Sequence, residues 1–181
     1  MTEITVDKHN RWTSVSLRWG GLSAALLIIF NLIAFIALPT DNPDNFAIGE
    51  IVGYTAIILS LTLLYKASAA HYAMEPDATY WSVVVTTLAA GIVTSFAFGA
   101  YNVFYVEVLD PEFMDTYFTY YIDEIRASGA ADAEAQIAAL QADRAMFESP
   151  LTQFIVMGMT VLAIAIPVSL ITAWIAKPRK D

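Results

Sequence analysis

Four long apolar stretches run along the chain, separated by polar segments. The first, residues 19–38, has twenty residues without a charge, and the third and fourth, residues 81–106 and 151–176, each have 26. The second, residues 48–65, carries Glu50 near its start. About 20 apolar residues are needed to cross a bilayer core as a helix. None of the four has the polar stripe of a soluble helix. The pattern therefore predicts an all-α integral membrane four-helix bundle.

Polar positions between the third and fourth stretches predict an amphipathic helical hairpin over about residues 111–147. Asp110 and Pro111 are typical of a helix start, because a carboxylate caps free backbone amides and proline fits the first turn. Residues 128–129 interrupt the pattern, and an alanine-rich helix follows them. The first arm has one face formed at intervals of four residues by Phe113, Tyr117, Tyr121 and Ile125.

The composition agrees with a membrane protein. Of 181 residues, 57% are hydrophobic and 15% are charged, whereas soluble domains have roughly half and a quarter. We expect residues 1–181 to form a single membrane domain. The chain has no cysteine, which excludes disulfides, thiolate catalysis and iron–sulfur ligation. Its net charge of −9 argues against a nucleic-acid partner.

The basic residues predict the topology. Seven of the nine lie in the amino tail, after the second stretch or in the carboxyl tail: Lys8, Arg11, Arg18, Lys66, Lys177, Arg179 and Lys180. With the acids counted in the same way, the two sides carry 7 − 5 = +2 and 2 − 13 = −11. Because cytoplasmic segments are enriched in Lys and Arg, both termini are predicted to be cytoplasmic, in a bacterial inner membrane, with the hairpin outside.

The first stretch could instead be a cleaved signal peptide, because Lys8, Arg11 and Arg18 precede it. Its apolar run exceeds the ~7 to 15 residues of a signal, and no A-x-A triplet ends it. We therefore favour a membrane span.

The hairpin is both acidic and aromatic, and two roles fit it. Tyrosine has an apolar ring and a wet hydroxyl, so the hairpin could rest as a cap at the lipid headgroups. The same residues could instead recognise a cationic or amphipathic partner, through charge attraction and cation–π contacts. Interfacial aromatic residues are common in membrane proteins, which favours the cap.

Polar and small residues inside the spans predict helix packing. An amide in mid-span needs a partner, small residues spaced four apart let helices approach closely, and a mid-span proline disturbs one backbone hydrogen bond. The positions are Asn31, Gly91, Ser95, Gly99, Pro167 and Ser169. Gly49 and Gly53 form a further GxxxG pattern. These contacts could lie within one chain or in a homo-oligomer.

Ionisable groups at membrane depth are candidate functional groups, and Glu50 and Glu107 are the candidates in these spans. Tyr54 follows Glu50 by four residues and could share a hydrogen bond with it. His9 and His71 are predicted on the opposite side. Motifs for catalysis, metals or cofactors are lacking, so no such site is expected. The predicted site for a ligand or partner comprises Glu50, Tyr54, Asn102, Tyr105 and Glu107.

Several motifs resemble a bacterial membrane family of unknown function, DUF4199. They are the E-x-x-G-Y of Glu50, Gly53 and Tyr54, the aromatic run through Pro111 and Phe113, "SGA" from Ser128, and "PVSLITAWI" in the last stretch. The resemblance extends from about Arg18 to Lys177. It implies four spans and an outer hairpin, and it implies no catalytic residue.

These observations favour a non-enzymatic membrane protein with a binding or accessory role, whose outer face meets a lipid, a small amphiphile or a membrane-protein partner. A small oligomeric transporter or channel, with Asn31, Pro167 and Ser169 lining a path, is the main alternative. An enzyme that acts on lipid at the outer interface is the third. Proteoliposome flux and headgroup turnover would separate the three classes.

Overall fold

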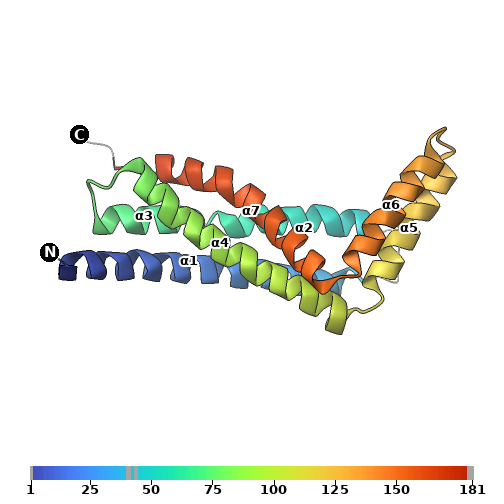
Figure 1. The fold of residues 1–181 in the computed structure, drawn as a ribbon, viewed down its shortest axis with the longest axis horizontal. Coiled ribbons are helices and arrows are strands. Elements are labelled where there is room, and N and C mark those ends of the chain that lie inside the picture. The colour runs from blue at the N-terminus through green and yellow to red at the C-terminus, as the bar shows by residue number, and fades with distance from the viewer. Residues whose placement is uncertain (1, 40–41, 43–44, 179–181) are drawn as a thin grey trace.

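The computed structural model describes residues 2–39, 42 and 45–178, and the side chains from residue 11 onward (Figure 1). Within these ranges all regular elements are helical. They are α1 (Thr2–Ala37), α2 (Asn45–Leu61), α3 (Leu64–Met74), α4 (Tyr80–Phe104), the π-helix η1 (Tyr105–Leu109), α5 (Phe113–Ser128), α6 (Ala133–Phe147) and α7 (Pro150–Ile175). The predicted all-α class is therefore confirmed for this part of the chain. Five residues used in the charge count lie outside it: Asp41, Asp44, Arg179, Lys180 and Asp181.

In the described residues, four helical stretches are long and apolar enough to cross a membrane: Arg11–Ala37, Asn45–Met74, Tyr80–Leu109 and Pro150–Ile175. Three of them are longer than the apolar patterns indicated, and the third, Tyr80–Leu109, is so by only four residues. The helix of the first begins at Thr2, and the second continues through a turn at residues 62–63 into α3. Alanine is the strongest helix former, so the alanine-rich residues after Lys66 prolong the helix past the end of the apolar pattern.

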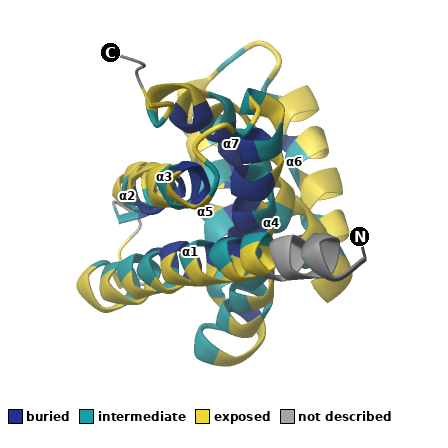
Figure 2. Cartoon of the chain, turned by 90° about the vertical axis from the view of Figure 1, so that its left-hand side faces the viewer, coloured by how far each residue is buried: buried dark blue, intermediate teal, exposed yellow. Residues whose placement is uncertain are grey.

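α4 is the central helix. It packs extensively on α7 and α1, and α3 packs on all three, whereas α2 packs mainly on α1. Figure 2 shows the buried residues gathered along α4 and the faces turned toward it. Small residues allow this approach: a Cβ added at Gly91 would lie 2.8 Å from Cβ of Ala165, and one at Gly99 would lie 2.7 Å from the carbonyl oxygen of Phe154.

The middle of the bundle is filled. Leu27, Leu61, Leu64 and Val161 are completely buried there. Hydroxyl groups join the helices between these apolar residues, since Ser23 donates to the carbonyl of Ser60 (2.9 Å) and Thr94 to that of Gly20 (3.1 Å). Such groups must be paired where water is excluded.

Gly49 and Gly53 differ from the glycines of α4. A Cβ added at either one would meet nothing within 4 Å. The prediction that their GxxxG pattern packs closely against another helix is therefore wrong within this chain. The pattern leaves open space on α2 because α4 does not approach there.

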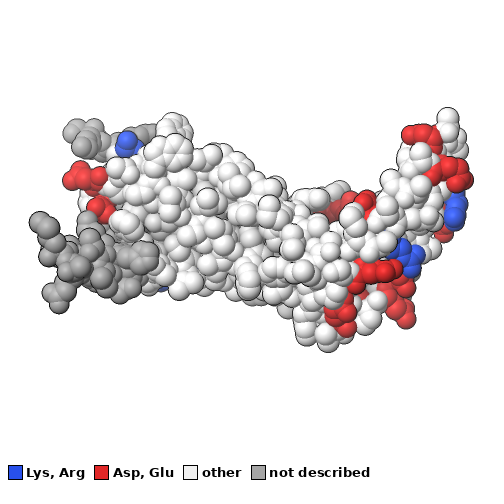
Figure 3. All heavy atoms as spheres, viewed as in Figure 1, with Lys and Arg blue, Asp and Glu red and all other residues white. Residues whose placement is uncertain are grey.

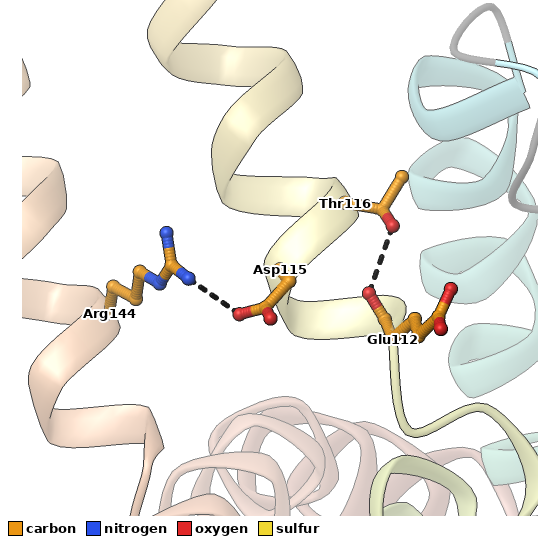
Figure 4. Close-up of polar contacts among 4 residues, drawn as sticks. All are labelled: Glu112, Asp115, Thr116 and Arg144. Carbon is orange, nitrogen blue, oxygen red and sulfur yellow. Dashed lines mark hydrogen bonds and ion pairs between the residues drawn. The ribbon is translucent and has the colours of Figure 1, made fainter.

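α5 and α6 pack against each other at the end of the bundle opposite the first residues of α1 and the last of α7 (Figure 1). We call this the hairpin end. α5 begins at Phe113, because residues 111–112 form a turn, and it stops at Ser128, where Gly129 takes a left-handed φ of 64°. Arg144 of α6 donates to Asp115 of α5 at 2.6 Å (Figure 4).

Charged side chains are unevenly distributed over the surface. On the face shown in Figure 3 the middle of the bundle carries none, whereas acidic groups gather at the hairpin end. The uncharged band matches the four apolar stretches, as expected for a surface in contact with lipid.

In the first turn of α5, the hydroxyl of Thr116 donates a hydrogen bond to the carbonyl of Glu112 at 2.9 Å (Figure 4).

Candidate functional site: a cavity at the hairpin end

A cavity of about 520 Å³ lies between the parts of α2 and α4 nearest the hairpin. α1 and α7 frame it, and α5 and α6 cover its end. Its volume falls within the roughly 300 to 1,000 Å³ of small-molecule sites. The walls are mostly apolar and aromatic, with a few amides, phenols and carboxylates.

Glu50 is the centre of the polar part of the cavity. Its Oε1 accepts hydrogen bonds from the hydroxyls of Tyr117 and Tyr121, both at 2.9 Å. The two tyrosines are four residues apart on α5, so they share one face and reach the same oxygen. Hydrogen bonds to a carboxylate are stronger than those between neutral groups. The contact therefore fixes α5 onto α2.

The two phenols remain protonated donors at neutral pH. Burial is the main reason that the pKa of Tyr117 rises above its ordinary value of 10.0, and the hydrogen bond to Glu50 adds to it. The same causes raise the pKa of Tyr121 to about 12. Each shift has the sign expected when a phenol is desolvated beside a negative charge.

Aromatic rings surround this contact. The ring of Phe46 on α2 lies 5.7 Å from that of Tyr117 and 6.1 Å from that of Phe113. The rings of Tyr117 and Tyr121 are 4.7 Å apart. Offset and edge-to-face pairs at such distances are stabilising. They make a firm aromatic wall between the hairpin and α2.

Two buried polar atoms on α4 lack partners. These are the hydroxyl of Tyr101 and Nδ2 of Asn102, and neither has a hydrogen-bond partner among the described residues. Both residues line the cavity. An unpaired buried polar group costs about 1 to 3 kcal/mol, so a hydrogen-bond partner would stabilise both atoms.

The chain widens into the π-helix η1 where α4 meets the cavity. π-turns are rare and are frequently found at functional sites. Tyr105, its first residue, lines the cavity, donates to Oδ2 of Asp110 at 3.3 Å, and stacks edge-on against Phe113 at 5.2 Å. The ring of Phe35 on α1 contacts Tyr105 at 5.5 Å.

The structure brings four of the five predicted site residues to the cavity: Glu50, Tyr54, Asn102 and Tyr105. Glu107 is not part of the lining. It accepts a hydrogen bond at 3.3 Å from Gln153, which also donates to the carbonyl of Phe147 at 2.9 Å, so Glu107 joins η1 to the start of α7.

The predicted hydrogen bond between Tyr54 and Glu50 is wrong. Glu50 is bonded to the tyrosines of α5, and Tyr54 is 55% exposed. A side chain four residues along the same helix competes poorly with two phenols that a packed helix brings to the carboxylate. Tyr54 therefore forms the rim of the cavity.

The residues predicted for helix packing lie in different parts of the bundle. Asn31 lines the cavity, and its amide donates to the carbonyl of Leu27 on its own helix at 2.9 Å. Gly91 and Gly99 lie between α4 and α7, and Ser95 bonds the carbonyl of Gly91 at 2.8 Å. α7 continues through Pro167, which is exposed, whereas Ser169 is completely buried.

Sequence reasoning missed several lining residues: Asn45, Phe46, Tyr101, Asp143 and Phe147. It assigned Tyr117 and Tyr121 to a face of the hairpin without a partner. The repeat of four in α5 and the single acid in the second span were visible signals, but the contact joins residues 67 and 71 positions apart. The periodicity of side chains relates positions within one helix, so it cannot predict a contact between residues so far apart in the sequence.

The lining has an unbalanced charge. It includes the carboxylates of Glu50 and Asp143 and, in the part of the chain that is described, no Lys or Arg. Arg144, next to Asp143, is paired with Asp115 on the other helix. Within the described residues no group of three or more His, Asp or Glu side chains could hold a metal ion.

His71 lies in α3, at the end of the bundle away from the hairpin. It is completely buried, stacks on Trp12 with ring centroids 5.0 Å apart, and bonds Thr86 through Nδ1 at 2.8 Å. It takes no part in the cavity.

Comparison with known proteins agrees with the resemblance seen in the motifs. No curated protein and no solved structure matches the chain. The model of the family described as protein of unknown function (DUF4199) matches residues 18–178, nearly the whole chain. The protein therefore belongs to the DUF4199 family.

Proposed function

We propose that this protein is a non-enzymatic, multi-pass protein of the bacterial inner membrane that binds a lipid or another small amphiphile in the cavity at the hairpin end. In this topology both termini are cytoplasmic and the hairpin lies outside, as the excess of Lys and Arg near the termini favours. The cavity then opens at the outer headgroup level, where an amphiphile has its polar part.

The observation that carries the proposal is the mixed lining of the cavity. Its walls are mostly apolar and aromatic, and the buried side chains of Ile57 and Phe98 belong to them. Asn31, Glu50 and Asn102 add polar side chains to the same lining. An amphiphile has an apolar chain and a polar head, so a cavity with both kinds of wall can hold it.

The nature of the polar groups also supports binding. The carboxylate is already fixed by two phenols, while Tyr101 and Asn102 offer unpaired donors. Fixed polar groups in an apolar pocket orient a ligand and give specificity.

Oligomeric transport is the weaker proposal. A path through one chain would have to pass the middle of the bundle, where Leu27, Leu61 and Val161 are completely buried and Gly91 meets Ala165. Pro167 faces outward from this core and Ser169 is buried in it. These contacts favour a cavity that is closed on its inner side.

A matched pair of glycines provides the test. A Cβ at Gly53, which lines the cavity, or at Gly21, which does not, meets nothing within 4 Å, so both sites accept a larger side chain. Gly53→Leu fills the cavity and Gly21→Leu is the control. Wild type and both variants are extracted from the same cells in a mild detergent and analysed by native mass spectrometry.

We expect one retained lipid or other small amphiphile on wild type and on Gly21→Leu, and much less on Gly53→Leu. Equal retention by the two variants, with helical content unchanged, would remove the cavity from the proposal.

A further inference from the structure

The cavity's ligand can be specified by the charges and donors that face it. The carboxylate of Glu50 uses Oε1 for both tyrosines, and Oε2 has no hydrogen-bond partner among the described residues. Glu50 is also exposed, and Asp143 adds a second carboxylate to the lining. Since the described lining has no Lys or Arg, neither carboxylate is neutralised inside the cavity.

We infer that the ligand is a single-chain amphiphile with a positively charged amine or quaternary ammonium head, which lies against Glu50 and the rings of Tyr117 and Phe46. This inference rests on the proposed function and names the ligand class for the same site. A cation near a carboxylate is attracted by Coulomb forces, and aromatic faces attract it further.

The unpaired groups of α4 specify what lies beside the head. Nδ2 of Asn102 is a donor, and the hydroxyl of Tyr101 can donate as well. Both residues line the cavity together with Glu50, so we expect the ligand to carry a neutral acceptor, such as an ester or amide carbonyl, next to its cation. A phosphate or carboxylate there would face Glu50 and Asp143 without a balancing cation from the protein.

The apolar chain of the ligand has apolar walls to lie against. Ile57 of α2, Phe98 of α4 and Met157 of α7 line the cavity. Ile57 and Phe98 are buried, so an apolar chain beside them is shielded from water.

The test compares amphiphiles with one chain length and different heads. Wild type in phosphatidylcholine nanodiscs is titrated with dodecylamine, dodecanol and dodecanoate, and binding is measured calorimetrically against empty nanodiscs. We expect dodecylamine to bind about tenfold more tightly than the other two, which corresponds to about 1.4 kcal/mol. The preference should shrink as salt is added, because the site is partly exposed.

Variants separate the groups. Glu50→Gln keeps a hydrogen-bond acceptor for the tyrosines and removes the charge, so the preference for dodecylamine should fall several-fold while dodecanol binding stays. Glu107→Gln, a carboxylate of the same end that lies outside the lining, is the control and should change neither. Lauroylcholine, which has an ester carbonyl, should bind more tightly than dodecyltrimethylammonium, and Asn102→Leu should remove that advantage.

The outcomes are distinguishable. Equal binding of the three heads to wild type overturns the cationic ligand and leaves the cavity as an amphiphile site. Absence of binding by all three overturns both. A preference for dodecylamine that survives Glu50→Gln also overturns the assignment to this site, and so does a preference that is lost in Glu107→Gln.

Discussion

The seam between α4 and α7 and the space between α2 and α4 show two opposite uses of small residues. In the seam, Gly91 and Gly99 let another helix approach so closely that an added Cβ would clash. Beside the cavity, Gly49 and Gly53 meet nothing. The same sequence pattern thus gives packing in one place and open volume in the other.

Polar groups also differ between the two regions. In the middle of the bundle the hydroxyls of Ser23 and Thr94 reach carbonyls of neighbouring helices. At the hairpin end Tyr101 and Asn102 keep buried atoms unpaired. Among the described residues, buried atoms of four others lack a partner as well, those of His71, Tyr72, Gln153 and Ser169, and Tyr101 and Asn102 differ from them because both line the cavity.

The largest expected effect breaks the packed region. Gly99→Ala should destabilise the protein by about 1 to 3 kcal/mol, because its methyl meets the backbone of Phe154, which cannot move alone. Gly21→Ala, where the methyl meets nothing, should be neutral or slightly stabilising, since alanine favours a helix more than glycine. Thermal unfolding in detergent measures both. Similar midpoints for the two variants would contradict the account of the seam.

The second effect concerns the contact that closes the cavity. Tyr117→Phe combined with Tyr121→Phe retains both rings and removes both hydrogen bonds to Glu50. Each bond is worth about 1 kcal/mol, so loss of both, about 2 kcal/mol, should make the amides of α5 exchange hydrogen roughly thirtyfold faster, while those of α4 are unchanged. Tyr120→Phe is the matched control on the same helix. Equal protection of α5 in the double variant and the control would show that the tyrosines do not fix the hairpin.

The hairpin end was only partly predictable from sequence. Glu50 was recognisable as the single acid in the second span, and the repeat of four residues gave the face of α5. That these two meet depends on how α5 packs at the end of the bundle, which periodicity within one helix does not describe. The π-helix at Tyr105 was equally hidden, because its extra residue per turn has no pattern of its own in the residues of η1.

The four spans were predictable for a simpler reason. Uncharged stretches of this length have one stable solution in lipid, a helix with all backbone groups paired. Their ends were less certain, since α1 and α3 continue into polar sequence that a helix tolerates in water. Polarity marks the membrane boundary, and it does not mark the helix boundary.

A pH titration sharpens the account of the closing contact. The pKa of Tyr121 is raised from 10.0 to about 12 in the folded protein, so this group stabilises the fold fully below pH 10, and its contribution is lost as pH rises toward 12. Tyrosinate absorbance, as a difference between wild type and Tyr121→Phe, should show a midpoint near 12. In Glu50→Gln that midpoint should move down. A wild-type midpoint at 10 would place Tyr121 in free solvent.

The smallest effect is expected at the ion pair between α5 and α6. Arg144 and Asp115 are close, but their side chains are 39% and 72% exposed. Pairs of this kind contribute about 0 to 1 kcal/mol and weaken in salt. Arg144→Gln should therefore lower the unfolding midpoint slightly in low salt and not at all in high salt. A large, salt-independent loss would mean that the hairpin depends on this pair more than on its apolar face.

The most direct measurement maps where an amphiphile lies on the protein. A long-chain amine with a photoreactive diazirine in its tail is added to wild type in nanodiscs, irradiated, and the adducts are located by peptide mass spectrometry. The account predicts adducts on the cavity walls, at residues 50–57 of α2 and 98–105 of α4 and η1, which excess dodecylamine suppresses and Gly53→Leu abolishes. Adducts spread evenly over the lipid-facing side of α7, unaffected by competitor or variant, would contradict it.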